Sequence, residues 1–126
     1  MLLKTYIVED NATIRENLIG TLEELACVNA VGTAESESEG VAWLTDNRNT
    51  WDLAIVDLFL KQGSGLGIVG ACKNRLPMQK VVVLSNYATA DIRQRCKQLG
   101  VDAVFDKSNE IDDLVAFCTR HRLSLV

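Results

Sequence analysis

Short apolar runs lead into residues that can do chemistry at several points of this sequence. Each of these runs is followed directly by acids, a hydroxyl or a lysine: Glu9-Asp10, Asp57, Ser85 and Asp106-Lys107. Asp57 is the candidate nucleophile, because a carboxylate can attack phosphorus and form an acyl phosphate. Lys107 could neutralise charge on the transferring group, and Ser85 could donate a hydrogen bond to a phosphoryl oxygen. The residue types therefore favour phosphoryl transfer onto a carboxylate.

The three acids Glu9, Asp10 and Asp57 also point to a metal ion. If the fold gathers them, they repel one another and stay ionised at low cost only with a cation among them. Hard oxygen ligands of this kind suit Mg²⁺. No histidine or cysteine stands at these positions, which argues against zinc. The sequence predicts a divalent site with weak, Mg²⁺-type affinity.

The elements that must position these residues alternate between strand and helix. Five β-rich runs are predicted, over residues 5–8, 27–33, 53–56, 81–84 and 103–105. A helical pattern follows each run. Asn11 is a plausible N-cap of the first helix, and Ser36 with Glu39 has the spacing of a capping box for the second. Gly100 is expected to end the fourth helix. The last helix begins near residue 111, where apolar residues recur at helical spacing.

This βα alternation predicts an α/β fold. We expect a flavodoxin-like, doubly wound five-stranded parallel sheet in the order 2-1-3-4-5, built as (βα)5. The runs at 53–56 and 81–84 are almost continuously apolar, as in strands covered on both faces. Ligands of such sheets bind outside the carboxyl ends of the strands. The candidate residues are all expected at that edge.

The composition narrows the classes of partner and location. The 126 residues carry a formal net charge of −4, which argues against direct nucleic-acid binding and against docking on anionic membranes. No apolar run approaches the about 20 residues of a membrane span, and no signal peptide is apparent. The four cysteines are scattered, so we expect buried, reduced thiols in a cytoplasmic protein. The lone His121 stands in a polar stretch and is expected to be solvated.

The whole set of motifs resembles the response-regulator receiver family of bacterial two-component systems. Glu9-Asp10 is similar to the family's acidic pair, and Asp57 within Ile55-Val56-Asp57-Leu58 to its phosphoacceptor. Ser85 is similar to the switch hydroxyl, Lys107 to the invariant lysine, and Gly65-Leu66 to the start of the third helix. The likeness covers essentially the whole chain. It predicts a single receiver domain over residues 1–126, with a core from about 3 to 121.

The resemblance implies a specific reaction and metal site. A histidine kinase or histidine phosphotransfer protein would supply the phosphoryl group from a phosphohistidine, in the presence of Mg²⁺. The family's metal is typically held by the positions of Asp10 and Asp57 and by the backbone carbonyl at Phe59, with Glu9 assisting. The phosphorylated domain would then switch its contacts with a downstream protein target, without a separate turnover activity.

One departure from the family pattern concerns signalling. The family's switch aromatic usually stands three residues before the lysine, which here is Val104. Phe105 follows it and is expected to point to the opposite face of the sheet. Tyr87 is therefore our candidate for a substitute reporter. The resemblance also places Phe59 and Tyr87, both of them bulky, at the rim of the path that water takes to an acyl phosphate. We predict slow self-dephosphorylation.

Two alternative functions remain open on the sequence alone. A pseudo-receiver would bind a partner without phosphorylation, but the complete set of site residues counts against it. A small phosphatase with an aspartate nucleophile would need a second acid two residues after Asp57, where Phe59 stands. The cognate kinase, the output target and the oligomeric state are not readable. Either the chain is a stand-alone regulator or it is a receiver cut from a longer protein.

Overall fold

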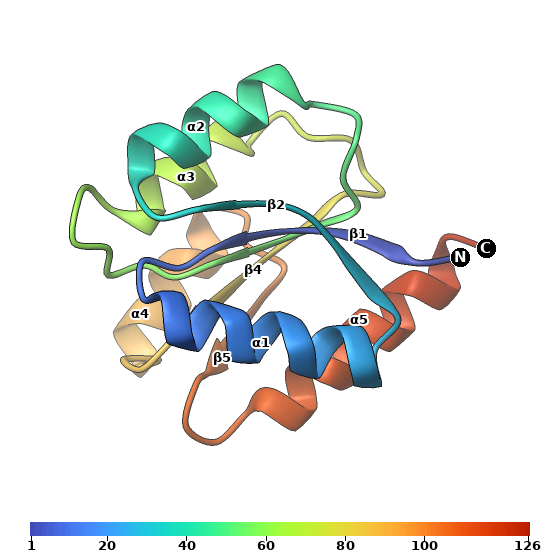
Figure 1. The fold of residues 1–126 in the computed structure, drawn as a ribbon. Coiled ribbons are helices and arrows are strands. Elements are labelled where there is room, and N and C mark those ends of the chain that lie inside the picture. The colour runs from blue at the N-terminus through green and yellow to red at the C-terminus, as the bar shows by residue number, and fades with distance from the viewer.

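A parallel five-stranded sheet forms the middle layer of the protein. The computed structural model describes residues 1–126. Strands and helices alternate strictly along the chain (Figure 1). Their bounds are β1 (Leu3–Val8), α1 (Ala12–Leu25), β2 (Val28–Ala34), α2 (Glu37–Asp46), β3 (Leu53–Val56), α3 (Gly65–Ala71), β4 (Lys80–Ser85), α4 (Ala90–Gln98), β5 (Ala103–Asp106) and α5 (Ile111–Ser124). The strands lie in the order β2-β1-β3-β4-β5, so the predicted flavodoxin-like fold is confirmed.

Helices cover both faces of this sheet. Helices α1 and α5 pack on one face and α2, α3 and α4 on the other (Figure 1). Alternate residues of each strand point to opposite faces, so Tyr6 and Val8 join the cluster under α2 and α3. Leu3 and Ile7 of the same strand join the cluster under α1 and α5. Because both faces are buried, the strands need apolar residues at nearly every position, which explains their continuous runs.

Local sequence signals fix several helix ends. The side chain of Asn11 accepts the Ile14 N–H at 3.0 Å, and Ser36 Oγ accepts the Glu39 N–H at 3.3 Å. Both predicted N-caps are therefore confirmed. Gly100 follows the end of α4 with φ +85°, a conformation that glycine adopts without a steric penalty.

Two predictions about single residues are wrong. His121 is buried, and its Nε2 lies 2.9 Å from the Asp52 carbonyl oxygen. Helix α5 runs on to Ser124, so His121 falls one turn after Cys118 on the face that packs against the sheet. Cys27 is exposed, whereas the other three cysteines are buried and all four are free. It stands between α1 and β2 with φ +53°, a turn position and not a strand position as predicted.

Candidate functional site

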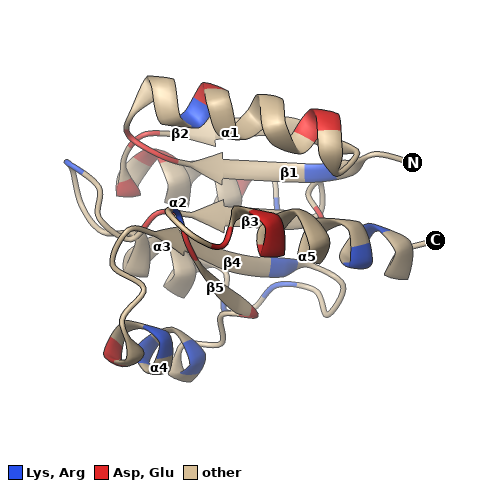
Figure 2. Ribbon diagram, turned by 90° about the horizontal axis from the view of Figure 1, so that it is seen from below, with Lys and Arg blue, Asp and Glu red and all other residues tan.

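Three carboxylates meet at the carboxyl edge of the sheet. Strands β1 and β3 are direct neighbours in a register that pairs Val8 with Val56, so the residues after them emerge side by side. One carboxylate oxygen each from Glu9, Asp10 and Asp57 lies within 4.8 Å of the others. Figure 2 shows acidic ribbon directly beyond the arrowhead of β1. The predicted clustering of these three acids is what the fold produces.

Lys107 brings one positive charge into this cluster. It follows β5, and its Nζ donates hydrogen bonds to Glu9 and, at 2.9 Å, to Asp57 Oδ2. Burial by itself lowers the pKa of Lys107, but its bonds to Glu9 and Asp57 outweigh that effect and raise the pKa above its ordinary value. Burial raises the pKa of Glu9 against the opposing hydrogen bond from Lys107. Lys107 therefore stays charged, and three acids face a single cation.

Backbone N–H groups orient each of the three carboxylates. The Phe59 N–H donates to Asp57 Oδ1 at 3.2 Å and the Asn11 N–H to Glu9 Oε2 at 3.2 Å. The Lys61 N–H reaches across from the loop after β3 to Asp10 Oδ2 at 2.7 Å. The negative charge left over and the hard oxygen donors are the set that suits Mg²⁺. Glu9, Asp10, Asp57 and the carbonyl of Phe59 are the groups that could hold it.

Ser85 lies at the same edge and is fully buried. It ends β4 beside Asp106, and its carbonyl accepts the Lys107 N–H at 3.0 Å. Its Oγ accepts the Tyr87 N–H at 3.1 Å but makes no hydrogen bond with Asp57. The hydroxyl hydrogen is therefore free to be donated to another group at this edge.

Comparison with known proteins decides the family. Residues 5–119 match the family described as the response regulator receiver domain. The chain belongs to this family. It is a bacterial-type receiver domain of two-component signalling, and receivers generally bind Mg²⁺ at an acidic pocket such as the one formed by Glu9, Asp10 and Asp57.

Individual relatives agree with this assignment. The receiver is 29% identical over 110 residues to the acid tolerance regulatory protein ActR of Rhizobium meliloti (strain 1021). The aligned residues make up 87% of this chain and 55% of ActR. It is 26% identical over 88 residues to the DNA-binding transcriptional activator DevR/DosR of Mycobacterium tuberculosis, covering 70% of this chain and 40% of that protein. The chain spans about half the length of the curated relatives it matches.

Solved structures support the fold. The REC domain of AraT, a response regulator from Geobacillus stearothermophilus, superposes with a TM-score of 0.77 over 98% of each chain at 23% identity. The helices of the receiver described here include none with the length and hydropathy needed to cross a membrane.

Two exposed aromatic rings stand beside the acidic cluster of the receiver. Phe59 comes two residues after Asp57 and Tyr87 two residues after Ser85, and their rings meet edge to face with centroids 5.2 Å apart. Their side chains remain more than half exposed, at 52% and 62%. This pairing joins the loop after β3 to the loop after β4, on the side of the site where the two rings are predicted to border the path of water.

The usual switch position of the receiver holds a small side chain. Val104 packs against the cluster under α3 and α4, while Phe105 packs on the other face, edge to face with Phe117. The predicted split of these two residues across the sheet is therefore confirmed. Arg93 of α4 donates to the Val104 carbonyl at 2.9 Å and also pairs with Glu110. An arginine thus ties α4 to β5 here.

One positioning contact could not be found from the sequence. Glu37 Oε1, at the start of α2, accepts the Ser64 N–H at 2.8 Å and so holds the loop after β3. Gly63 and Gly67 lie against Glu37 so closely that an added Cβ would come within 2.4 Å and 2.3 Å of its side chain. No local pattern links residue 37 to residue 64, because the contact depends on how α2 packs beside α3.

Proposed function

We propose that Asp57 accepts a phosphoryl group and that the phosphorylated receiver changes its contacts with a protein partner. The observation that carries this proposal is a nearly buried Asp57 carboxylate with the Lys107 ammonium 2.9 Å from Oδ2 and two further acids beside it. Burial and crowding of like charges cost stability, and such costs are retained where they serve chemistry.

The proposed reaction is transfer from a phosphohistidine of a histidine kinase or histidine phosphotransfer protein. A carboxylate oxygen of Asp57 attacks phosphorus, and the phosphorus–nitrogen bond breaks with its electron pair going to the imidazole, which keeps or takes up a proton. Lys107 neutralises charge on the transferred group, and the Ser85 hydroxyl donates to one of its oxygens.

Mg²⁺ is part of the proposal. Asp10, Asp57 and the backbone carbonyl of Phe59 would hold it, with Glu9 assisting. When bound, the ion offsets the negative charge that the carboxylates and the phosphoryl group bring together. The hydrogen bonds from Lys61 and Asn11 hold Asp10 and Glu9 in place for this role.

We further propose that the domain is a switch and not an enzyme with turnover. Phe59 stands where an aspartate phosphatase would carry its general acid, so a leaving group would find no proton donor there. The complete cluster also disfavours a pseudo-receiver.

We propose that residues 1–126 form one receiver domain acting in the cytoplasm, and that it contacts no nucleic acid directly. Relatives named as DNA-binding regulators leave open a DNA-binding output in a longer protein.

Exposure to acetyl phosphate with Mg²⁺, followed by intact mass measurement, tests the proposal. The wild-type protein should gain the mass of one phosphoryl group, and Asp57→Ala should gain none while keeping its circular dichroism spectrum. Asp106→Ala is the matched control, because Asp106 also ends a strand but its carboxylate serves the Ser108 N–H. It should be labelled. Labelling of Asp57→Ala would contradict the assignment, and repeated turnover of the donor would favour a phosphatase.

A further inference from the structure

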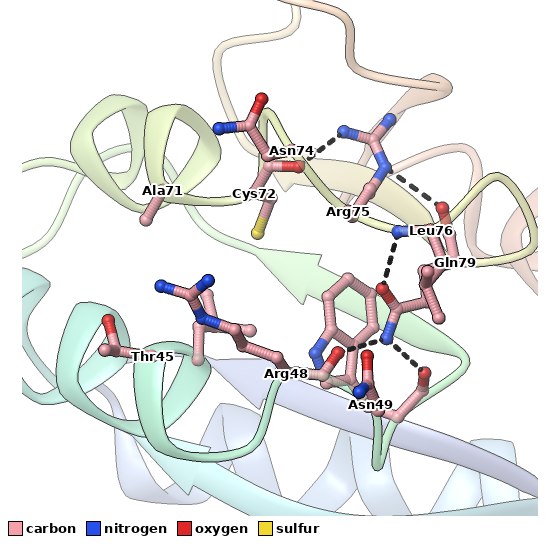
Figure 3. Close-up of a pocket in the computed structure, with 11 residues that line it drawn as sticks. Thr45, Arg48, Asn49, Ala71, Cys72, Asn74, Arg75, Leu76 and Gln79 are labelled. Carbon is pink, nitrogen blue, oxygen red and sulfur yellow. Dashed lines mark hydrogen bonds between the residues drawn. The ribbon is translucent and has the colours of Figure 1, made fainter.

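Helices α2 and α3 lie side by side on one face of the sheet, but they meet differently at their two ends (Figure 1). Toward the amino edge of the sheet they border a cavity of about 360 Å³, which Trp51 also lines (Figure 3). The buried Gln79 side chain closes that end, since its Nε2 donates to the carbonyls of Arg48, at 2.7 Å, and Trp51, at 3.0 Å. Toward the carboxyl edge Glu37, at the start of α2, lies directly against Gly67 of α3. The two helices are thus tightly packed at the end that borders the acidic cluster.

Glu37 holds the loop between β3 and α3 at two points. Its backbone N–H donates to the Gln62 carbonyl at 3.1 Å, and its Oε1 accepts the Ser64 N–H at 2.8 Å. Gly63 between these two anchored residues has φ +85°, so the chain turns directly over the Glu37 side chain. Although this side chain is half-buried, no cation pairs with it. The loop is therefore the only polar partner of the Glu37 carboxylate.

The two anchored residues lead directly to the acidic cluster. Ser64 forms an isolated antiparallel bridge with Phe59, whose carbonyl is an expected ligand of the metal. Lys61, next to the other anchored residue, donates its backbone N–H to Asp10 Oδ2 at 2.7 Å. Each arm of the loop therefore connects the start of α2 to one group of the proposed Mg²⁺ site.

We propose that Glu37 is a positioning residue of the metal site. By fixing the loop at its two anchored residues, it sets the place of the Phe59 carbonyl and of the hydrogen bond on Asp10. Partners that orient metal ligands without touching the metal commonly change metal affinity by about tenfold or more. This role rests on the proposed Mg²⁺ site, and it makes α2, which carries no ligand, a part of that site.

Removal of the Glu37 carboxylate tests this role. Glu37→Ala should weaken Mg²⁺ binding by about tenfold, measured from the backbone amide signals of ¹⁵N-labelled protein titrated with MgCl₂. In EDTA, the amide protons of Lys61 and Ser64 should exchange with water severalfold faster than in wild type, because the loop opens more often. Glu37→Gln keeps an acceptor for the Ser64 N–H and should bring both quantities to within about twofold of wild type.

Two glycines of α3 provide a matched pair of variants. A Cβ at position 67 would lie 2.3 Å from Glu37 Oε2, so Gly67→Ala should push the carboxylate off the loop and weaken Mg²⁺ binding as Glu37→Ala does. A Cβ at position 70 would meet nothing within 4 Å, so Gly70→Ala should leave Mg²⁺ binding unchanged. Added to Glu37→Ala, the Gly67→Ala change should have no further effect, because the carboxylate that it displaces is already gone. Circular dichroism and urea unfolding check that each variant keeps the fold.

The role of Glu37 is overturned if Glu37→Ala binds Mg²⁺ like wild type, if Glu37→Gln does not recover, or if the effects of Glu37→Ala and Gly67→Ala add. If Glu37→Ala does not fold, the comparison of Gly67→Ala with Gly70→Ala decides, and equal Mg²⁺ affinity in these two variants overturns the role. If wild type itself shows no Mg²⁺-dependent shift, the proposed metal site is wrong. Faster amide exchange in Glu37→Ala would still show that Glu37 holds the loop, and unchanged exchange would overturn that as well.

Discussion

The two edges of the sheet use the same residue types in opposite ways. At the amino edge, Asp102 accepts the Val81 N–H at 2.8 Å and pairs with Arg75, and Asp52 accepts the Lys4 N–H at 2.9 Å. Both acids therefore satisfy a backbone N–H group, and Asp102 also has an arginine as its cation. At the carboxyl edge, three acids lie together, and only Glu9 and Asp57 pair with a cation, which is Lys107 for both, while Asp10 has no ion pair. Balanced polar groups stabilise a fold, whereas gathered like charges mark a place where the fold serves chemistry.

The largest expected effect lies at the amino edge. Gln79→Ala removes three hydrogen bonds from a buried side chain and leaves their backbone partners unsatisfied, so the free energy of unfolding should fall by about 2–4 kcal/mol. Urea unfolding measures the loss. The folded fraction should still be phosphorylated at the wild-type rate. A slower rate would mean that the two edges are coupled, and the comparison would fail.

The opposite pattern is expected for Asp10→Asn at the carboxyl edge. It should weaken Mg²⁺ binding and slow labelling by acetyl phosphate by more than about tenfold, because a charged oxygen donor is lost. Without metal the variant should unfold at a higher temperature than wild type, since repulsion falls. Asp91→Asn, which removes an exposed charge at the start of α4, serves as the control and should leave both Mg²⁺ binding and the labelling rate unchanged. Labelling that survives EDTA would rule out the metal.

A pH series on Glu9→Gln sharpens the comparison further. Because the pKa of Glu9 is raised in the folded protein, its stabilising contribution is present at low pH and is lost as the pH rises through that pKa. In EDTA at neutral pH, Glu9→Gln should therefore melt a few degrees above wild type. The gap should close as the pH falls and wild-type Glu9 takes up its proton. A variant less stable than wild type at neutral pH would show that attraction to Lys107 outweighs burial.

The smallest expected effect concerns the two rim rings. The double variant Phe59→Asn with Tyr87→Glu should shorten the lifetime of the acyl phosphate severalfold, because polar groups then orient water where bulky rings stood. The decay of phosphorylated protein after removal of the donor measures it. Phe117→Leu, which alters an aromatic pair on the far face of the sheet, is the control. Equal decay in all three proteins would show that the rings do not set the lifetime.

Local patterns predicted most of the fold. Strand β3 has the predicted bounds, and the bounds of the other strands differ from the prediction by one or two residues. The prediction succeeds because apolar runs and the caps Asn11 and Ser36 are local signals, formed by residues close together in the sequence. The sequence also predicted the meeting of Glu9, Asp10 and Asp57, since parallel strands bring their carboxyl ends to one edge.

Features that depend on packing between distant segments stayed invisible. The contact of Glu37 with Ser64 and the cavity beside Trp51 arise from the seating of α2 against α3, which no short motif encodes. His121 was misjudged for a related reason. A polar stretch predicts solvent exposure, but α5 continues for another turn against the sheet and thereby buries His121.

The strand order has a consequence for how the protein is made. Glu9, Asp10 and Asp57 all accompany β1 and β3, which lie side by side with β2, whereas Lys107 follows β5. A ribosome adding about 5–20 residues per second completes the three acids several seconds before Lys107. A nascent chain that folds its first three strands therefore gathers the acids before their cation exists. The arrival of β5 then supplies the one side-chain cation of the centre, and until that point only a dissolved cation such as Mg²⁺ can offset the three acids.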